Sequence, residues 1–304
     1  MKLPALVALV LLAGPVVAAA DTLEDKYQSL KDAVTAKNIP EIKKLALEIL
    51  PMVAEAAAAP APEAEDAKQA WTNGIAHAKS IGQYAEYSIC TAALESPAPT
   101  LVELIGTLEH ENPKSQYLDT AYGPYLVALT QTGSASKVIP IAEKALVNFP
   151  ENGDLLLVLA DNAINHKQPD RALTLANRLT ASLNKHTKPP EGVNAAQWEK
   201  KHSATLGRGY WIAGVIYGDR SQYANADKNL RAALPLIQGN EAMMGPALFY
   251  LGMANYQLGK MTLNKAKVLE GAKFSEQSAA IDSVYADQAR HNALVMKTEA
   301  DRMR

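Results

Sequence analysis

The chain has 304 residues, of which 48% are hydrophobic and 6% aromatic, and its formal charge is −2 at pH 7. A charge this close to zero gives no electrostatic case for nucleic acid or an anionic membrane as partner. The single cysteine, Cys90, excludes an internal disulfide. We expect it to be a small buried apolar residue, with an intermolecular disulfide as the alternative. Abundant Ala and Leu, with little strand-like alternation, predict an all-α fold.

Residues 1–20 have the pattern of a signal peptide. Lys2 gives a positive start, residues 3–12 are nearly all apolar, and residues 18–20 are three alanines before Asp21. The apolar run is shorter than the about 20 residues that span a bilayer. We therefore expect export to the periplasm or the medium, cleavage after residue 20 and no stable membrane insertion afterwards. An uncleaved N-terminal anchor is the alternative.

Residues 21–58 predict an N-terminal helical hairpin. Apolar residues recur at helical spacing from Leu23 to Val34 and from Ile42 to Val53, and Pro40 lies at the break between them. Residues 59–65 follow as an Ala/Pro linker, because two prolines among alanines interrupt a helix. The alanines can equally extend the preceding helix.

Short helical stretches alternate with turns over residues 66–304. The predicted breaks lie at residues 80–82, 96–99, 112–114, 132–134, 149–153 and 167–170, in a longer loop at 185–192, and near 218, 239 and 258–260. Helix-turn-helix units at this spacing along the chain indicate an internal repeat.

Four segments, starting at Asp119, Gly153, Gly207 and Gly245, share one register of large and small residues, as in repeats of about 34 residues. The first two follow each other without a gap, and the third comes after the insertion at residues 185–192. Small residues let the two helices of a unit touch, and large ones fill the space between units. The matching residues are Tyr122, Tyr125, Leu129, Gly133, Ala142, Ala145 and Pro150 in the first unit; Leu156, Leu159, Ala160, Ala163, Ala172, Ala176 and Leu179 in the second; Tyr210, Ala213, Gly214, Tyr217, Tyr223, Ala226, Leu230 and Ala233 in the third; and Leu248, Leu251, Gly252, Ala254, Tyr256 and Gly259 in the fourth.

The second helix of the fourth unit departs from this register. Ala266 and Leu269 fit only with an insertion near residues 261–262. A last helix from about Val284 places Tyr285, Ala289, Ala293 and Met296 on one face and charges on the other, as expected of the polar cap that a solenoid needs.

The sequence thus resembles the tetratricopeptide-repeat family over about residues 85–304, although no unit has the full Trp-Leu-Gly-Tyr set. Residues 112–115, leading into Ala121 and Tyr122, also look like repeat junctions of bacterial envelope adaptor proteins. The resemblance implies a right-handed α-solenoid of helical hairpins over residues 66–304, whose first helices line a concave groove that binds partners.

By that resemblance, the groove-facing positions of each unit give a candidate partner-binding site. Its residues are Asp161, Asn165, Arg208, Trp211, Phe249, Met253, Tyr256 and Gln257, with Asp154 and Asp219 at further groove-facing positions. The polar members would hold a peptide backbone or a charge, and the aromatic ones would bury apolar side chains. The alternative is that Trp211 and Phe249 pack under the 185–192 loop or the insertion near residue 261 and close the groove.

The chemistry-bearing residues give no enzymatic motif. The six histidines lack zinc-site spacing, one cysteine excludes thiolate sites, and there is no nucleophile elbow or phosphate-binding loop. We therefore expect a non-enzymatic scaffold or adaptor for a protein or peptide partner, with no cofactor and no metal. An envelope glycan-cleaving enzyme on a helical solenoid and a structural subunit of an envelope complex are the alternatives.

Overall fold

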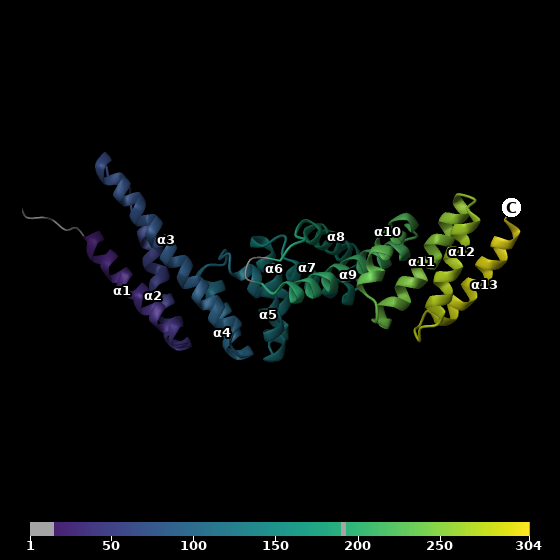
Figure 1. The fold of residues 1–304 in the computed structure, drawn as a ribbon, viewed down its shortest axis with the longest axis horizontal. Coiled ribbons are helices and arrows are strands. Elements are labelled where there is room, and N and C mark those ends of the chain that lie inside the picture. Colours follow the sequence, from purple (N-terminus) through teal and green to yellow (C-terminus); the bar gives the residue numbers. More distant parts are fainter. Residues whose placement is uncertain (1–14, 190–192, 304) are drawn as a thin grey trace, which may run out of the picture. The chain divides into compact units, whose positions relative to one another are not determined.

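The structure is a computed structural model that describes residues 15–189 and 193–303 (Figure 1). Thirteen α-helices and two short 3-10 helices make up the regular structure of these residues, which contain no strand. The prediction of an all-α fold is confirmed. Of the predicted signal peptide, residues 1–14 lie outside the described residues, and the backbone of 15–20 belongs to the first helix. No helix in the described ranges has the length and apolarity that a membrane crossing requires.

The chain forms two compact units, residues 1–135 and 136–304. The N-terminal unit contains α1 (Pro15–Thr35), α2 (Ile39–Ala58), α3 (Glu65–Leu94), α4 (Ala98–Glu111) and α5 (Leu118–Gln131). Helix α3 packs against both α1 and α2, and α4 packs against α3 and α5. The predicted Ala/Pro linker therefore joins helices of one unit, and the division falls instead between Ala135 and Ser136.

The predicted break at residues 80–82 is wrong. Residues 80–82 lie in the middle of α3, which is continuous from Glu65 to Leu94. Gly82 is a packing contact and not a turn, because a Cβ there would lie 3.0 Å from Val53 Cγ1 on α2. The glycine lets the two helices approach each other.

The C-terminal unit continues with η1 (Ala135–Lys137), α6 (Val138–Asn148), α7 (Gly153–Asn165), α8 (Pro169–Lys185), α9 (Ala195–Asp219), α10 (Tyr223–Ala233), η2 (Leu234–Leu236), α11 (Glu241–Met261), α12 (Lys265–Ala279) and α13 (Ala286–Arg302). Each α-helix of this unit packs against the next one in the chain. In addition α7 touches α9, α9 touches α11 and α11 touches α13. Ion pairs also connect α6 with α8 (Arg171–Glu143, 2.6 Å) and α10 with α12 (Arg231–Glu270, 2.9 Å).

The turns after α1, α5, α7, α9 and α11 share one length and one geometry. Each contains a residue of positive φ, namely Lys37, Gly133, Lys167, Ser221 and Leu263. The amide of the following residue donates to a carbonyl near the end of the helix, as in Gln168 N to Ala163 O (2.8 Å) and Gln222 N to Tyr217 O (2.8 Å). This pattern satisfies carbonyls that a helix end leaves without partners. After α1, α7, α9 and α11, the helix that follows the turn packs against the helix that precedes it.

The predicted register is observed in the unit from Gly153, where all seven matching residues are buried: Leu156, Leu159, Ala160, Ala163, Ala172, Ala176 and Leu179. In the unit from Asp119, the matching residues of α5 and α6 fall on the two sides of the division between the compact units. The inward face of the last helix is also as predicted, with Ala289, Ala293 and Met296 buried in α13.

The register predicted for the second helix of the fourth unit is wrong. Ala266 and Leu269 are exposed, and Val268 and Ala272 face the core of α12 instead. The cause is that α11 continues past the predicted break at 258–260 and ends at Met261. Gly259 lies inside α11, where a Cβ would meet Val268 Cγ2 at 2.7 Å, so it marks a close approach of α12.

Candidate partner-binding surface

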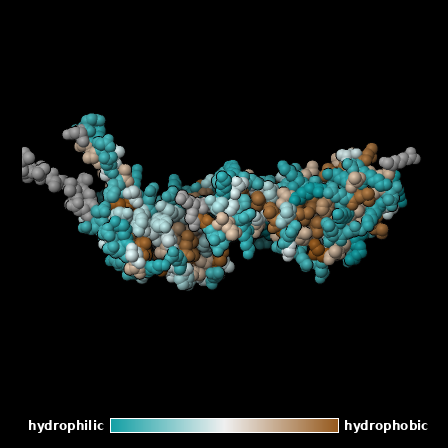
Figure 2. All heavy atoms as spheres, in the orientation of Figure 1, coloured by the Kyte–Doolittle hydropathy of each residue, from teal (hydrophilic) through white to brown (hydrophobic). Residues whose placement is uncertain are grey.

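The predicted groove residues all lie on α7, α9 and α11, which with α13 form a series of alternate helices in mutual contact. We call α7, α9, α11 and α13 the alternate-helix layer. Figure 2 shows hydrophobic side chains gathered on the face it draws in the region of α11. The polar and aromatic residues predicted to meet a ligand also connect neighbouring helices of this layer.

Asp161, Arg208 and Trp211 come together across α7 and α9. Arg208 donates to Asp161 Oδ1 through Nε (2.9 Å) and Nη2 (2.7 Å). The guanidinium lies over the Trp211 ring, 4.5 Å from its centroid. A cation held both by a carboxylate and by an indole face keeps one orientation, because each contact restricts the same planar group.

The Trp211 side chain is half-buried. Its Nε1 donates to the carbonyl of Met243 in the first turn of α11 (2.8 Å). The ring also packs against the core cluster that includes Leu230, Ala233 and Leu251. Trp211 therefore has a packing role of its own, while part of its surface stays accessible.

Two further polar pairs follow the same alternate-helix pattern. Asp154 on α7 accepts from Lys201 Nζ on α9 (2.6 Å), and Asp219 on α9 accepts from the Tyr250 hydroxyl on α11 (3.4 Å). Burial, with help from Tyr285 and Asp219, raises the pKa of Tyr250. Asn165 is exposed at the end of α7.

Phe249 and Met253 lie on the side of α11 that faces α13. The Phe249 ring contacts Tyr250 (5.3 Å between centroids) and Tyr285 (4.8 Å), and it remains half-buried. Met253 Sδ accepts from Asn292 Nδ2 at 3.3 Å. These side chains leave an aromatic and thioether surface that is partly open to solvent.

Tyr256 and Gln257 differ in exposure although they are neighbours. Tyr256 is buried, and its hydroxyl accepts from Lys260 Nζ (3.2 Å), which also pairs with Glu299 on α13 (3.2 Å). Burial is the largest cause that raises the pKa of Tyr256. Gln257 is half-buried on the adjacent side of α11. Of the eight candidates, Tyr256 is thus the one least accessible to a ligand.

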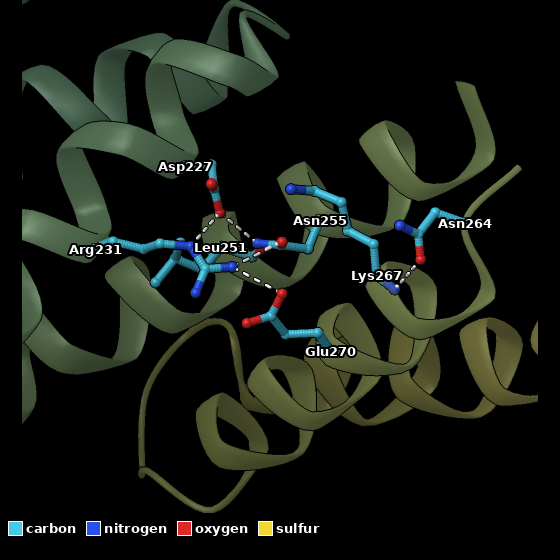
Figure 3. Close-up of polar contacts among 7 residues, drawn as sticks. All are labelled: Asp227, Arg231, Leu251, Asn255, Asn264, Lys267 and Glu270. Carbon is cyan, nitrogen blue, oxygen red and sulfur yellow. Dashed lines mark hydrogen bonds and ion pairs between the residues drawn. The ribbon is translucent and has the colours of Figure 1, made fainter. Parts of the chain in front are cut away.

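The sequence analysis missed a buried polar network on α10, α11 and α12 (Figure 3). Asn255 is fully buried, and its amide donates to Asp227 Oδ1 (2.6 Å) and to the Leu251 carbonyl (2.9 Å). Arg231 donates to Asn255 Oδ1 (2.9 Å) and Asp227 Oδ1 (2.8 Å) and pairs with Glu270 (2.9 Å). In the sequence, the signal for this network was Asn255 itself, a polar residue between Ala254 and Tyr256 on the apolar side of α11. The network joins three helices.

A second missed feature is an open pocket of about 580 Å³ in the C-terminal unit. It is lined by residues of α6, α7 and α8: Glu143, Leu146, Leu159, Asp170, Arg171, Thr174, Leu175 and Arg178. Its two arginines already have partners, since Arg171 pairs with Glu143 (2.6 Å) and Arg178 donates to the Pro150 carbonyl (2.9 Å). The pocket therefore lacks a free cationic group for an anionic ligand.

The N-terminal unit carries a chain of four tyrosines, which we call the tyrosine strip. Tyr27 on α1 contacts Tyr84 on α3 (5.3 Å between centroids), Tyr84 contacts Tyr87 (6.3 Å), and Tyr87 contacts Tyr117 before α5 (5.7 Å). Tyr87 is 47% exposed. The strip is the most extended aromatic surface described in this unit.

Within the described ranges, no group of three or more His, Cys, Asp and Glu side chains could hold a metal ion. Cys90 is buried, and its thiol donates to the Tyr117 carbonyl at 3.5 Å. Burial raises the pKa of the Cys90 thiol to about 11. A thiol in this state is a poor nucleophile, because the reactive form is the thiolate.

Comparison with protein-family models and with curated proteins found no match to this chain.

Proposed function

We propose that the chain is an exported, non-enzymatic scaffold of the tetratricopeptide type, which binds a protein or peptide partner on its alternate-helix layer. The observation that carries the proposal is that α7, α9, α11 and α13 pack against one another in series, whereas α6 meets α8, and α10 meets α12, through long polar side chains, in the Arg171–Glu143 and Arg231–Glu270 ion pairs. A one-sided series of this kind brings one face of successive hairpins together, as in a right-handed α-solenoid with a concave recognition surface.

Shared turn geometry supports the proposal. The αL residues Lys167, Ser221 and Leu263 end three of the four helices of the layer, α7, α9 and α11, in the same way. Partly exposed aromatic side chains such as Phe249, beside a fixed cation such as Arg208, are typical of surfaces that bury partner side chains.

The test uses substitutions that leave the packing intact. Asn165→Arg with Gln257→Arg adds two bulky cations on the layer, at an exposed and a half-buried position. Asn225→Arg with Gln277→Arg adds the same groups at exposed positions of α10 and α12 and serves as the matched control. Native envelope extract of the source organism is passed over each tagged protein. We expect the first pair to lose captured partners and the second to retain them.

Two results contradict the proposal. If both pairs capture the same partners as the unsubstituted chain, with unchanged helicity, the layer is not the binding surface. If only the α10 and α12 pair loses partners, the opposite face binds them.

The tyrosine strip favours a second candidate function, that of a structural subunit which contacts a neighbouring chain through its N-terminal unit. Tyr87→Ser removes an exposed ring from α3, and Leu94→Ser, at a residue that is 42% exposed on the same helix, is the control. Cross-linking with mass spectrometry should then find inter-chain contacts concentrated on residues 23–53 and reduced by the tyrosine substitution alone. Contacts concentrated on the alternate-helix layer contradict this candidate.

A further inference from the structure

The turn between α11 and α12 exposes two large apolar side chains. Met261, the last residue of α11, is 75% exposed, and Leu263 is 83% exposed with a φ of 51°. Figure 2 shows hydrophobic atoms at the end of the unit where α11 meets α12. These side chains contribute little to the core of the unit.

The four equivalent turns carry different residues at the position of Leu263. They have Lys37, Gly133, Lys167 and Ser221, which are polar or lack a side chain. Left-handed backbone suits glycine and, among other residues, asparagine best, because a Cβ approaches the following carbonyl oxygen. Neither backbone preference nor burial accounts for leucine at this tip. Two exposed apolar side chains two residues apart, one of them on unfavourable backbone, offer a surface for a contact outside the fold.

Lysines flank the two apolar side chains. Lys260 precedes Met261 and pairs with Glu299 (3.2 Å), whereas Lys265 and Lys267 begin α12. Lys265 is exposed, Lys267 is half-buried, and neither takes part in an ion pair recorded for the described part of the chain. The whole chain has a formal charge of −2, so the positive charge of this turn is local.

We infer that the α11–α12 turn binds to the surface of an anionic bilayer. Met261 and Leu263 would enter the boundary between headgroups and acyl chains, and Lys265 and Lys267 would lie against lipid phosphates. Charge complementarity decides between this occupant and an apolar protein pocket, because the two lysines on the first turns of α12 have no acidic partner of their own. The inference goes beyond partner binding on the alternate-helix layer and does not depend on it.

A probe at the turn tests the inference in the full chain. Leu263→Cys and, as the matched control, Ser221→Cys place an environment-sensitive bimane at the same αL position of two different turns. Cys90 is buried and stays unlabelled. Vesicles of phosphatidylcholine with about 30 mol% phosphatidylglycerol should shift the emission of the probe at 263 to the blue and leave that at 221 unchanged, and pure phosphatidylcholine should bind at least about tenfold more weakly.

A second pair of variants separates binding from folding. Leu263→Asn removes the apolar side chain and introduces a residue that tolerates left-handed backbone, so the melting temperature should stay equal or rise. Because residue 263 is then changed, the bimane probe is attached at Met261→Cys instead. With this probe, Leu263→Asn should bind the anionic vesicles about tenfold more weakly, and Lys265→Gln with Lys267→Gln should weaken binding by a similar factor. Ser221→Asn is the control and should change nothing.

The inference is overturned if the probe at 263 responds no more than the probe at 221, whatever other segment of the chain meets the vesicle. It is also overturned if neutral and anionic vesicles give equal responses, or if Leu263→Asn binds as tightly as the parent protein.

Discussion

The two compact units pack their helices in different ways. In the C-terminal unit, glycines bring helices together so closely that a Cβ on Gly214 would lie 2.5 Å from Leu230 Cγ, and one on Gly252 would lie 2.3 Å from Ser275 Oγ. Main-chain atoms also lie close there, since Leu230 N is 3.1 Å from the Gly214 Cβ position and Gly271 O is 3.1 Å from that of Gly252. In the N-terminal unit, a Cβ on Gly82 would meet only side-chain atoms of Val53, at 3.0 Å or more, and a buried carboxylate also joins elements, since Glu86 accepts from Asn112 Nδ2 and Ser115 Oγ, each at 2.7 Å. Main-chain atoms cannot rotate away from a larger residue, whereas side chains can adjust. The N-terminal unit should therefore tolerate small increases in side-chain volume that the C-terminal unit does not.

The largest expected effect breaks a backbone contact of the C-terminal unit. A Cβ at Gly271 would lie 2.8 Å from the Gly252 carbonyl oxygen and 2.8 Å from the Tyr256 nitrogen, and both are main-chain atoms that cannot rotate away. We expect Gly271→Ala to lower the free energy of unfolding by about 3 kcal/mol. Gly74 in α3 has nothing within 4 Å of its Cβ position, so Gly74→Ala should raise it by about 0.5–1 kcal/mol. Urea denaturation measures both, and equal effects would contradict the comparison.

The next effect concerns buried polar groups in the two units. Asn255→Ala leaves Asp227, Arg231 and the Leu251 carbonyl each without one partner, and we expect a loss of about 2 kcal/mol. Glu86→Gln keeps an acceptor for Asn112 or Ser115, so it should lose about 1 kcal/mol. Denaturation midpoints in the same buffer rank the two variants. A larger loss for Glu86→Gln would show that the N-terminal unit depends more on its buried polar contacts.

A third prediction concerns how the stability of the N-terminal unit depends on pH. Burial, with Glu109 nearby, raises the pKa of Tyr125 from 10.0 to about 12. Because the folded pKa lies above the unfolded one, the stabilisation is complete below pH 10 and is lost as pH rises toward 12. Between pH 10 and 11 the loss for this group is roughly 1 kcal/mol. Between pH 10 and 11, Tyr125→Phe should therefore lose about 1 kcal/mol less stability than the parent. Urea denaturation at each pH measures the difference.

Burial raises the pKa of Tyr122 as well, so the difference in stability between Tyr125→Phe and the parent is the quantity to compare. Burial also raises the pKa of Tyr250 in the C-terminal unit. Tyr250→Phe is the control that assigns the remaining pH dependence to that unit. If the free energy of unfolding has the same pH dependence in Tyr125→Phe and in the parent, the Tyr125 hydroxyl does not contribute to that dependence.

The smallest effect is expected from the ion pair between α7 and α9. Asp161 and Arg208 are 36% and 29% exposed, so solvent screens their attraction. A double-mutant cycle with Asp161→Asn and Arg208→Gln should give a coupling of about 0.5 kcal/mol that shrinks with added salt. A coupling that resists salt would indicate a more enclosed pair and a more rigid surface on this layer.

Much of the helical structure was predictable from the sequence because it depends on local patterns. The apolar spacing at Leu156, Leu159 and Ala163 indicated the buried face of α7, and turn residues near Gly133 and Lys167 indicated helix ends. Gly82 and Gly259 were misread as breaks for a physical reason. A glycine in a helix has the same sequence signature whether it ends the helix or admits a neighbouring backbone, and only the neighbour decides.

The resemblance to tetratricopeptide repeats placed Asp161 and Arg208 at groove-facing positions, and the structure places them on α7 and α9 of the alternate-helix layer. Their ion pair and the hydrogen bond from Trp211 to Met243 could not be predicted, because they depend on the distance between helices. Asn255 was missed because nothing in its local pattern says that Asp227 and Arg231 meet it from another helix.

By itself, the sequence determined that the chain is helical and where most of its helices begin and end, because helix propensity, apolar period and turn chemistry act over a few residues. Only the tertiary structure decided which helices touch, that the division of the chain falls at Ala135 and Ser136, and which polar residues are used in packing. Those outcomes depend on how residues far apart in sequence fit together, because a few tenths of an ångström at a glycine decide whether two helices can pack in contact.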